Sequence, residues 1–186
     1  MRDADISLRD ELVQHEAMNE GYHPRMEKLH NANAAALEEI MDEVGYPGLS
    51  MVGKAGSNAC WLIIQHAIGQ PAFMKKSLVF LREATSAKES DPNLLAYLSD
   101  RIAVLEGRLQ KYGTQFDWDE HGEMSPSPLD NVSLVNLRRQ KLGLNSVEEQ
   151  TDLMRKQAQD ENLNPPEDLT QHQADYDAFR RRVGWT

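Results

Sequence analysis

The chain has 186 residues, and its 20 Lys and Arg against 30 Asp and Glu give a net charge of −10. Hydrophobic residues make up 40% and charged residues 27%, the balance of an ordinary globular protein. The acidic excess argues against nucleic-acid binding, because binding to phosphates relies on clustered Lys and Arg.

Two further features of composition point to the cytoplasm. No stretch approaches the roughly 18 apolar residues that a membrane span needs, and the polar N-terminal segment does not resemble a signal peptide. The single Cys60 can form no internal disulfide and excludes a Cys-based zinc site. We therefore expect a cytoplasmic protein that binds neither nucleic acid nor membrane.

Hydrophobic spacing and capping residues predict a mainly α-helical chain. Apolar residues recur at three- and four-residue spacing, and Gly or Pro punctuates the segments between them. A short extended piece is expected at 49–52 and a strand or extended segment at 109–118. The expected helices lie at about 8–18, 25–44, 57–68, 71–87, 92–106, 132–141 and 146–161.

We expect one helical-bundle domain with a short extended or β segment. Residues 1–24 would form an N-terminal helix that ends in the motif Asn-Glu-Gly-Tyr-His-Pro, and residues 25–145 the helical core domain. Residues 146–186 would form a C-terminal helical appendage, because apolar residues become sparse there. A homodimer is also compatible with the sequence.

The first candidate site is Gln65-His66, at the end of the most hydrophobic predicted helix. Burial there would keep the imidazole neutral, which is the state that a general base or a metal ligand requires. The alternative is a core histidine that is hydrogen-bonded to a backbone carbonyl.

The second candidate is Asp100, which lies on a helix face of small residues, with Ala96 and Ala103 beside it. A carboxylate in such a groove needs a partner, because an unpaired buried charge is costly. The partner could be His66, which Asp100 would then orient, or a cation such as Arg101 in a structural ion pair.

The third candidate is the segment Tyr112-Gly113-Thr114-Gln115, which combines a permissive glycine with neutral donors and acceptors. It suits a polar ligand, and it equally suits a strand that tucks under a loop. A fourth set, His23, His30 and His66, could hold a metal ion together with a carboxylate. His30 lies one heptad before Leu37 and should point inward, but no compact metal-binding signature is present.

Several short motifs follow one another along the chain in a fixed order and spacing: Gly45-Tyr46-Pro47, Val52-Gly53, Trp61 to Ala67, Ala96 to Arg101, Tyr112 to Gln115, Arg138-Arg139 and Leu142 to Leu144. Taken together, these motifs resemble a bacterial family of uncharacterised proteins, domain-of-unknown-function family 6624. The similarity covers roughly residues 25–153. Two positions depart from the family pattern: Tyr46 stands where the family usually has Trp, and Met74 where it usually has Gln.

The resemblance implies that His66, Asp100, Arg101 and the segment 112–115 belong to one site, but it supplies no established reaction or cofactor. We expect an enzyme, a hydrolase or a lyase, that acts by acid/base chemistry on a small polar or peptide-like substrate. Its catalytic residues would be His66 as base and Asp100 as the orienting carboxylate. A non-catalytic binding module and a metal-dependent enzyme are the alternatives. The expected substrate-binding residues are Gln65, Arg101, Tyr112, Thr114 and Gln115.

Overall fold

The computed structural model describes residues 1–14 and 22–186, which form eight helices and one two-stranded sheet. The expected mainly α-helical fold is therefore confirmed. Residues 19–21 of the Asn-Glu-Gly-Tyr-His-Pro motif lie outside the described residues. By its internal packing the chain divides into two compact units, Met1–Leu95 and Ala96–Thr186. This boundary falls within the segment 25–145 that the sequence suggests as a core.

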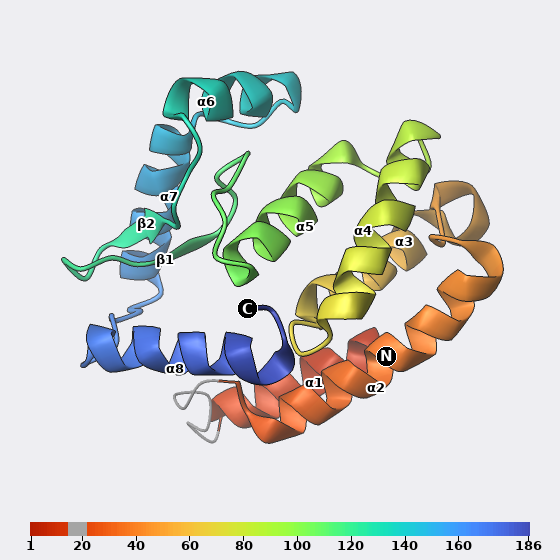
Figure 1. The fold of residues 1–186 in the computed structure, drawn as a ribbon, viewed down its shortest axis with the longest axis horizontal. Helices are drawn as coiled ribbons and strands as arrows, with labels where there is room; N and C mark the ends of the chain where they lie inside the picture. Colours follow the sequence, from red (N-terminus) through yellow and green to blue (C-terminus); the bar gives the residue numbers. More distant parts are fainter. Residues whose placement is uncertain (15–21) are drawn as a thin grey trace. The chain divides into compact units, whose positions relative to one another are not determined.

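The first unit consists of helices, which Figure 1 colours from red to yellow-green. α1 packs against α2 and α3, α2 packs against α3, and α3 packs against α4. Their facing sides are apolar and fully enclosed, with Leu37, Met41, Ile64, Met74 and Leu81 almost inaccessible to solvent. The helices are α1 (Arg2–Gln14), α2 (Pro24–Val44), α3 (Leu49–His66), α4 (Pro71–Ser86) and the first turn of α5 (Pro92–Leu105).

Helix α3 begins earlier than the sequence predicts. Residues 49–52 form a helical turn rather than an extended piece, and the chain bends at Gly53 before the helix continues to His66. Gly53 has φ 68° and ψ 175°, a backbone conformation that residues with a Cβ atom rarely adopt. The glycines therefore mark a bend inside a helix, not the loop in front of one.

The second unit contains the rest of α5, the only sheet among the described residues, and three further helices. Strands β1 (Phe116–Trp118) and β2 (Met124–Pro126) pair antiparallel, with Phe116 opposite Pro126. Helix α7 packs against β2, and α6 packs against α7. The segment expected to be extended, 109–118, thus includes a short strand at its end. The helices are α6 (Val132–Lys141), α7 (Val147–Asp160) and α8 (Leu169–Val183).

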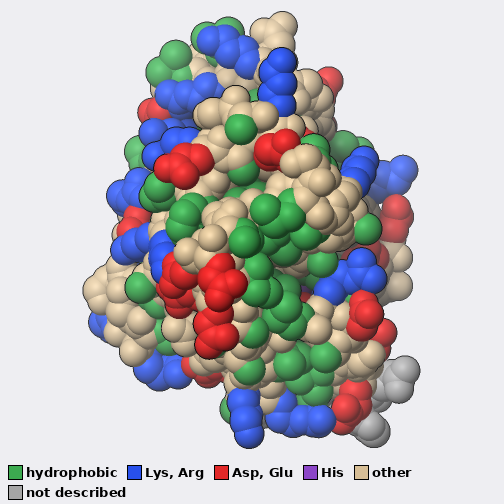
Figure 2. All heavy atoms as spheres, turned by 90° about the vertical axis from the view of Figure 1, so that its right-hand side faces the viewer, with side chains coloured by type: hydrophobic (Ala, Val, Ile, Leu, Met, Phe, Trp, Pro, Cys, Tyr) green, Lys and Arg blue, Asp and Glu red, His purple; other side chains and the backbone are tan. Residues whose placement is uncertain are grey.

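The surface mixes charges of both signs. Figure 2 shows acidic and basic side chains on the same face, with hydrophobic side chains between them. Among the described residues, no helix is both long and apolar enough to cross a membrane.

Candidate functional site

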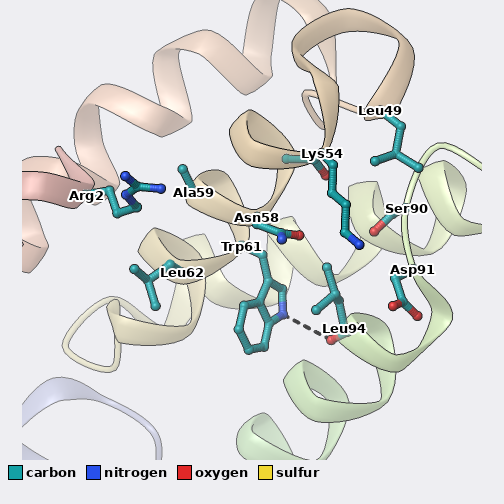
Figure 3. Close-up of a pocket in the computed structure, with 11 residues that line it drawn as sticks. Arg2, Leu49, Lys54, Asn58, Ala59, Trp61, Leu62, Ser90, Asp91 and Leu94 are labelled. Carbon is teal, nitrogen blue, oxygen red and sulfur yellow. Dashed lines mark hydrogen bonds between the residues drawn. The ribbon is translucent and has the colours of Figure 1, made fainter.

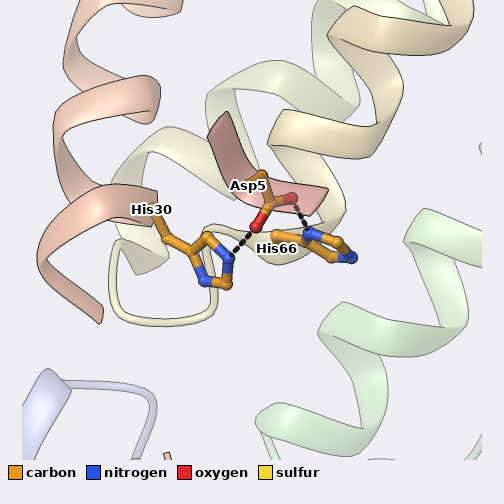
Figure 4. A group of neighbouring side chains, drawn as sticks. All are labelled: Asp5, His30 and His66. Carbon is orange, nitrogen blue, oxygen red and sulfur yellow. Dashed lines mark hydrogen bonds and ion pairs between the residues drawn. The ribbon is translucent and has the colours of Figure 1, made fainter. Parts of the chain in front are cut away.

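His66 is the last residue of α3, and its carboxylate partner comes from α1. The Nδ1 atom of His66 lies 2.7 Å from the Oδ2 atom of Asp5 (Figure 4). The two residues are 61 positions apart in the sequence. The packing of α1 against α3 brings them together, so this pair is a product of the tertiary fold.

The other oxygen of Asp5 contacts a second histidine. The Nε2 atom of His30, on α2, lies 2.7 Å from Asp5 Oδ1, so the carboxylate stands between two imidazole rings (Figure 4). The phenol oxygen of Tyr22 lies 2.6 Å from the Nδ1 atom of His30. Tyr22, His30, Asp5 and His66 thus form one continuous chain of hydrogen bonds within the first unit.

Burial differs along this chain. The side chains of Asp5 and His30 are 5% and 8% exposed, whereas that of His66 is 24% exposed. His30 shares the buried face of α2 with Met26, Leu37 and Met41, which confirms its expected inward position. Of the two imidazoles, that of His66 is therefore the more accessible to solvent.

The protonation of Asp5 determines that of its neighbours. Burial by itself would raise the pKa of Asp5, but the hydrogen bonds and charges of His30 and His66 outweigh it and hold the pKa below its ordinary value. Asp5 is therefore an anion at neutral pH, and an ionised carboxylate can only accept hydrogen bonds. His30 must donate through Nε2–H, and His66 must donate through Nδ1–H.

This arrangement fixes the tautomer of a neutral His66. With the proton on Nδ1, the lone pair lies on Nε2, which points away from Asp5 (Figure 4). With Nε2–H on His30, its Nδ1 accepts the Tyr22 hydroxyl hydrogen. Two neutral imidazoles leave the cluster with a net charge of −1, so that accepting one proton makes it electrically neutral. Such a cluster can hold a proton, which is the requirement for a general base.

Asp100, the carboxylate expected to orient His66, belongs to the second unit and has other partners. Its two oxygens accept hydrogen bonds from the backbone N–H groups of Lys111, Tyr112 and Thr114 at 2.8–3.2 Å, and from the Thr114 hydroxyl at 3.2 Å. Burial raises the pKa of Asp100, and these donors oppose the rise. Asp100 is completely buried and holds a loop in place. The orienting carboxylate beside His66 is Asp5.

Side chains of the second unit form several hydrogen bonds with the segment 112–115. Buried Arg139 donates to the carbonyl oxygens of Tyr112 and Gly113 at 2.8 and 3.0 Å. Arg101 donates from Nε to Gln115 Oε1 at 3.0 Å. This network fits the interpretation of a segment tucked under a loop better than that of an open ligand-binding wall.

Two further candidates occupy the first unit. His23 is the N-cap of α2, where its Nδ1 accepts the N–H of Arg25 at 3.2 Å. It is not part of the group of possible metal ligands that the structure brings together, which consists of Asp5, His30 and His66 with ligand atoms within 4.8 Å of one another. Gln65 is half-buried next to His66.

Sequence reasoning missed Asp5, although a signal was present. Asp5 lies seven residues before Leu12, and both are buried on one face of α1. A carboxylate on the apolar face of an amphipathic helix requires a buried partner. Applied to residues 1–12, that rule would have marked Asp5 as a candidate.

The fold and the cluster define a mainly α-helical protein with a buried carboxylate between two imidazoles. The model of a family of unknown function, DUF6624, matches residues 1–162, so the chain belongs to this family. The match includes Asp5, His30 and His66. No curated protein and no solved structure is significantly similar to the chain.

Tyr46 and Met74, the two positions at which we expect a departure from the family pattern, are both buried. Tyr46 is buried, and its hydroxyl donates to the Ser57 carbonyl oxygen at 2.9 Å. Met74 is fully buried on α4.

Proposed function

We propose that the protein is an enzyme in which His66 acts as a general base and Asp5 orients it. The observation that carries the proposal is the 2.7 Å contact from His66 Nδ1 to a buried, ionised Asp5. A carboxylate in this position holds the imidazole in the tautomer with a basic Nε2, and stabilises the imidazolium that forms when Nε2 takes a proton. Hydrolysis through an activated water, or elimination by proton abstraction, uses such a group directly.

We place this reaction in the cytoplasm, on a small polar or peptide-like substrate. The unpaired Cys60 and the acidic composition favour that compartment and disfavour a nucleic-acid substrate. His30 and Tyr22 are positioning residues in this proposal. His30 contacts Asp5 and Tyr22 contacts His30, so both act on the reaction only through Asp5 and His66.

A metal-dependent enzyme is the second candidate, since the ligand atoms of Asp5, His30 and His66 are close enough to share one ion. The 2.7 Å contacts favour the first candidate over the second. Ligands bound tetrahedrally at about 2.1 Å lie about 3.4 Å from one another, whereas 2.7 Å is a normal length for a charge-assisted hydrogen bond. The geometry therefore supports the hydrogen-bonded cluster better.

The test compares wild type with His66→Gln, using p-nitrophenyl acetate as a general probe of an exposed base and then a panel of amides, esters and hydroxy acids. A positioned base contributes roughly a hundredfold or more to a rate, so the variant should lose about that factor. His121→Gln is the matched control, because that imidazole is 76% exposed and lies in the other unit.

Nitrogen-15 NMR of the histidine rings tests the same proposal without a substrate. We expect neutral His66 to carry its proton on Nδ1. A neutral His66 with its proton on Nε2, or equal rates for wild type and His66→Gln together with a loss of stability in the variant, would contradict the proposal and support a structural histidine in a non-catalytic binding module.

A further inference from the structure

A cavity of about 620 Å³ lies within the first unit, beside the amino-terminal part of α3 (Figure 3). Its apolar wall includes Trp61, Leu62 and Leu94. The Trp61 ring is held in place by a hydrogen bond from its Nε1–H to the Leu94 carbonyl oxygen, at 3.2 Å. The volume falls in the range of small-molecule sites, which are mostly apolar with a few placed polar groups.

The cavity is connected to the catalytic pair through two helices. Asn58 and Leu62 line it, and Asn58, Leu62 and His66 follow one another at intervals of four residues on α3. Residues at this spacing lie on one face of a helix. On α1, Arg2 lines the cavity and lies three residues before Asp5. The end of the cavity that Leu62 and Arg2 line therefore lies about one helical turn from His66 and Asp5.

The polar end of the cavity carries one basic and one acidic side chain, Lys54 and Asp91, which form no ion pair with each other. Figure 3 shows the Lys54 amine and the Asp91 carboxylate on the same side, with Ser90 beside them. Among the described residues, neither Lys54 nor Asp91 forms an ion pair within 4 Å. One oxygen of Asp91 accepts the N–H of Asn93 at 2.8 Å, which leaves the carboxylate further acceptor capacity.

Ser90 adds a buried hydroxyl to this end. It is 5% exposed, and its oxygen has no hydrogen-bond partner among the residues that the structure describes. The Tyr46 hydroxyl donates to the Ser57 carbonyl oxygen at 2.9 Å, and Ser90 lies near enough to help lower the pKa of Tyr46 against the effect of burial. A buried hydroxyl without a partner is costly, and a ligand carboxylate would accept its hydrogen.

We propose that this cavity binds an α-amino acid with an apolar side chain as a zwitterion. Lys54 and Ser90 bind its carboxylate, Asp91 binds its ammonium group, and the side chain lies against Trp61, Leu62 and Leu94. One part of the inference rests on the proposed function: if His66 is a general base, the bond that reacts lies at the end of the ligand side chain nearest His66. The binding itself does not depend on the catalytic proposal.

The experiment follows the Trp61 indole N–H signal by NMR, assigned with a Trp61→Phe variant, during titration with three probes. The probes are phenylalanine, N-acetylphenylalanine, which lacks the ammonium group, and phenylalanine amide, which lacks the carboxylate. Phenylalanine should shift the signal saturably, and each derivative should bind at least about tenfold more weakly, because either Lys54 or Asp91 then lacks its partner on the ligand.

Two conservative variants locate the charges. Lys54→Met should weaken phenylalanine about tenfold and leave the amide unchanged, whereas Asp91→Asn should weaken phenylalanine and leave the N-acetyl derivative unchanged. Asn retains the capping function of Asp91 at α5. Lys28→Met, an exposed lysine that does not line the cavity, is the control and should bind all three probes as wild type does.

Equal binding of the three probes, or no shift of the Trp61 signal by phenylalanine at about 20 mM, would overturn the inference, since affinity weaker than this is not specific recognition. Repeating the titration with His66→Gln separates the two proposals. We expect phenylalanine to bind this variant as it binds wild type. If His66 proves not to be catalytic, the amino-acid site is still supported. If the titration fails, the result of the His66 activity assay does not change.

Discussion

The two units each contain a buried aspartate, and their partners differ in kind. Asp5 in the first unit accepts hydrogen bonds from two imidazole rings, which can gain or lose protons. Asp100 in the second unit accepts from backbone N–H groups and one hydroxyl, which keep their hydrogens at any physiological pH. A carboxylate with titratable partners can take part in proton transfer, whereas one with amide partners can only fix the backbone.

The two pKa shifts express the same contrast. The imidazoles stabilise the anion of Asp5 enough to lower its pKa despite burial, whereas burial outweighs the neutral donors around Asp100 and raises its pKa. Burial therefore does not identify a functional carboxylate by itself. The groups that donate hydrogen bonds to the carboxylate, imidazoles or backbone amides, show whether it can take part in proton exchange.

The largest expected effect is on stability, in the second unit. Asp100→Ala leaves the buried N–H groups of Lys111, Tyr112 and Thr114 without an acceptor, which should cost about 3 kcal/mol or more of unfolding free energy. Urea unfolding measures the loss, and hydrogen exchange should become faster at residues 111–114. The control Asp152→Ala, at an exposed position on α7, should change stability by less than about 0.5 kcal/mol. Equal losses of unfolding free energy in the two variants would contradict a structural role for Asp100.

In the first unit, substitution should affect activity more than stability. Asp5→Asn keeps one acceptor oxygen, and an imidazole can change its tautomer to accept a hydrogen bond from the new amide, so the stability loss should be about 1 kcal/mol. The negative charge is lost in every arrangement, so a protonated His66 is no longer neutralised. Hydrolysis of p-nitrophenyl acetate should fall about a hundredfold. Full activity in Asp5→Asn would show that Asp5 does not assist His66.

The sequence predicted much of this framework because the relevant signals are local. Periodicity placed His30 on the inner face of α2, and proline marked the starts of α4 and α5. Small neighbours correctly indicated that Asp100 is buried.

The partners of the buried groups could not be predicted in the same way. A buried carboxylate demands hydrogen-bond donors, but imidazole, guanidinium and backbone N–H groups all satisfy that demand. The donors around Asp100 are amides 11 to 14 residues away, which no side-chain motif can indicate. Asp5 and His66 meet only because α1 packs against α3, across 61 residues of sequence.

Acid titration should separate the two carboxylates in opposite directions. Asp5 has a lowered pKa in the folded state, so the stability that it contributes is present above its ordinary value of 3.8 and is lost as the pH falls through its folded pKa. Asp100 has a raised pKa, so the pH-dependent part of its contribution is present below 3.8 and is lost as the pH rises through its folded pKa, while its hydrogen bonds to the backbone remain.

Carbon-13 NMR of the two side-chain carboxyl groups measures these midpoints directly. We expect Asp5 to titrate below 3.8 and Asp100 above it. Their assignments come from the Asp5→Asn and Asp100→Asn spectra. Midpoints in the reverse order would contradict the distinction between a carboxylate that serves proton transfer and one that anchors a loop.

The smallest expected effect comes from metal removal, and it tests whether hydrogens or a metal ion lie between Asp5 and its two histidines. In the hydrogen-bonded cluster, the ring nitrogens that face Asp5 carry hydrogens and cannot coordinate a metal, so EDTA should shift the melting temperature by less than about 1 °C. Three results together would instead favour the metal-dependent enzyme. Elemental analysis would find about one metal ion per chain, and EDTA would lower the melting temperature. The His30→Gln substitution would lower the melting temperature as well, whereas His121→Gln would not. In that case His66 Nδ1 would be a ligand atom, and the tautomer argument for a basic Nε2 would no longer hold.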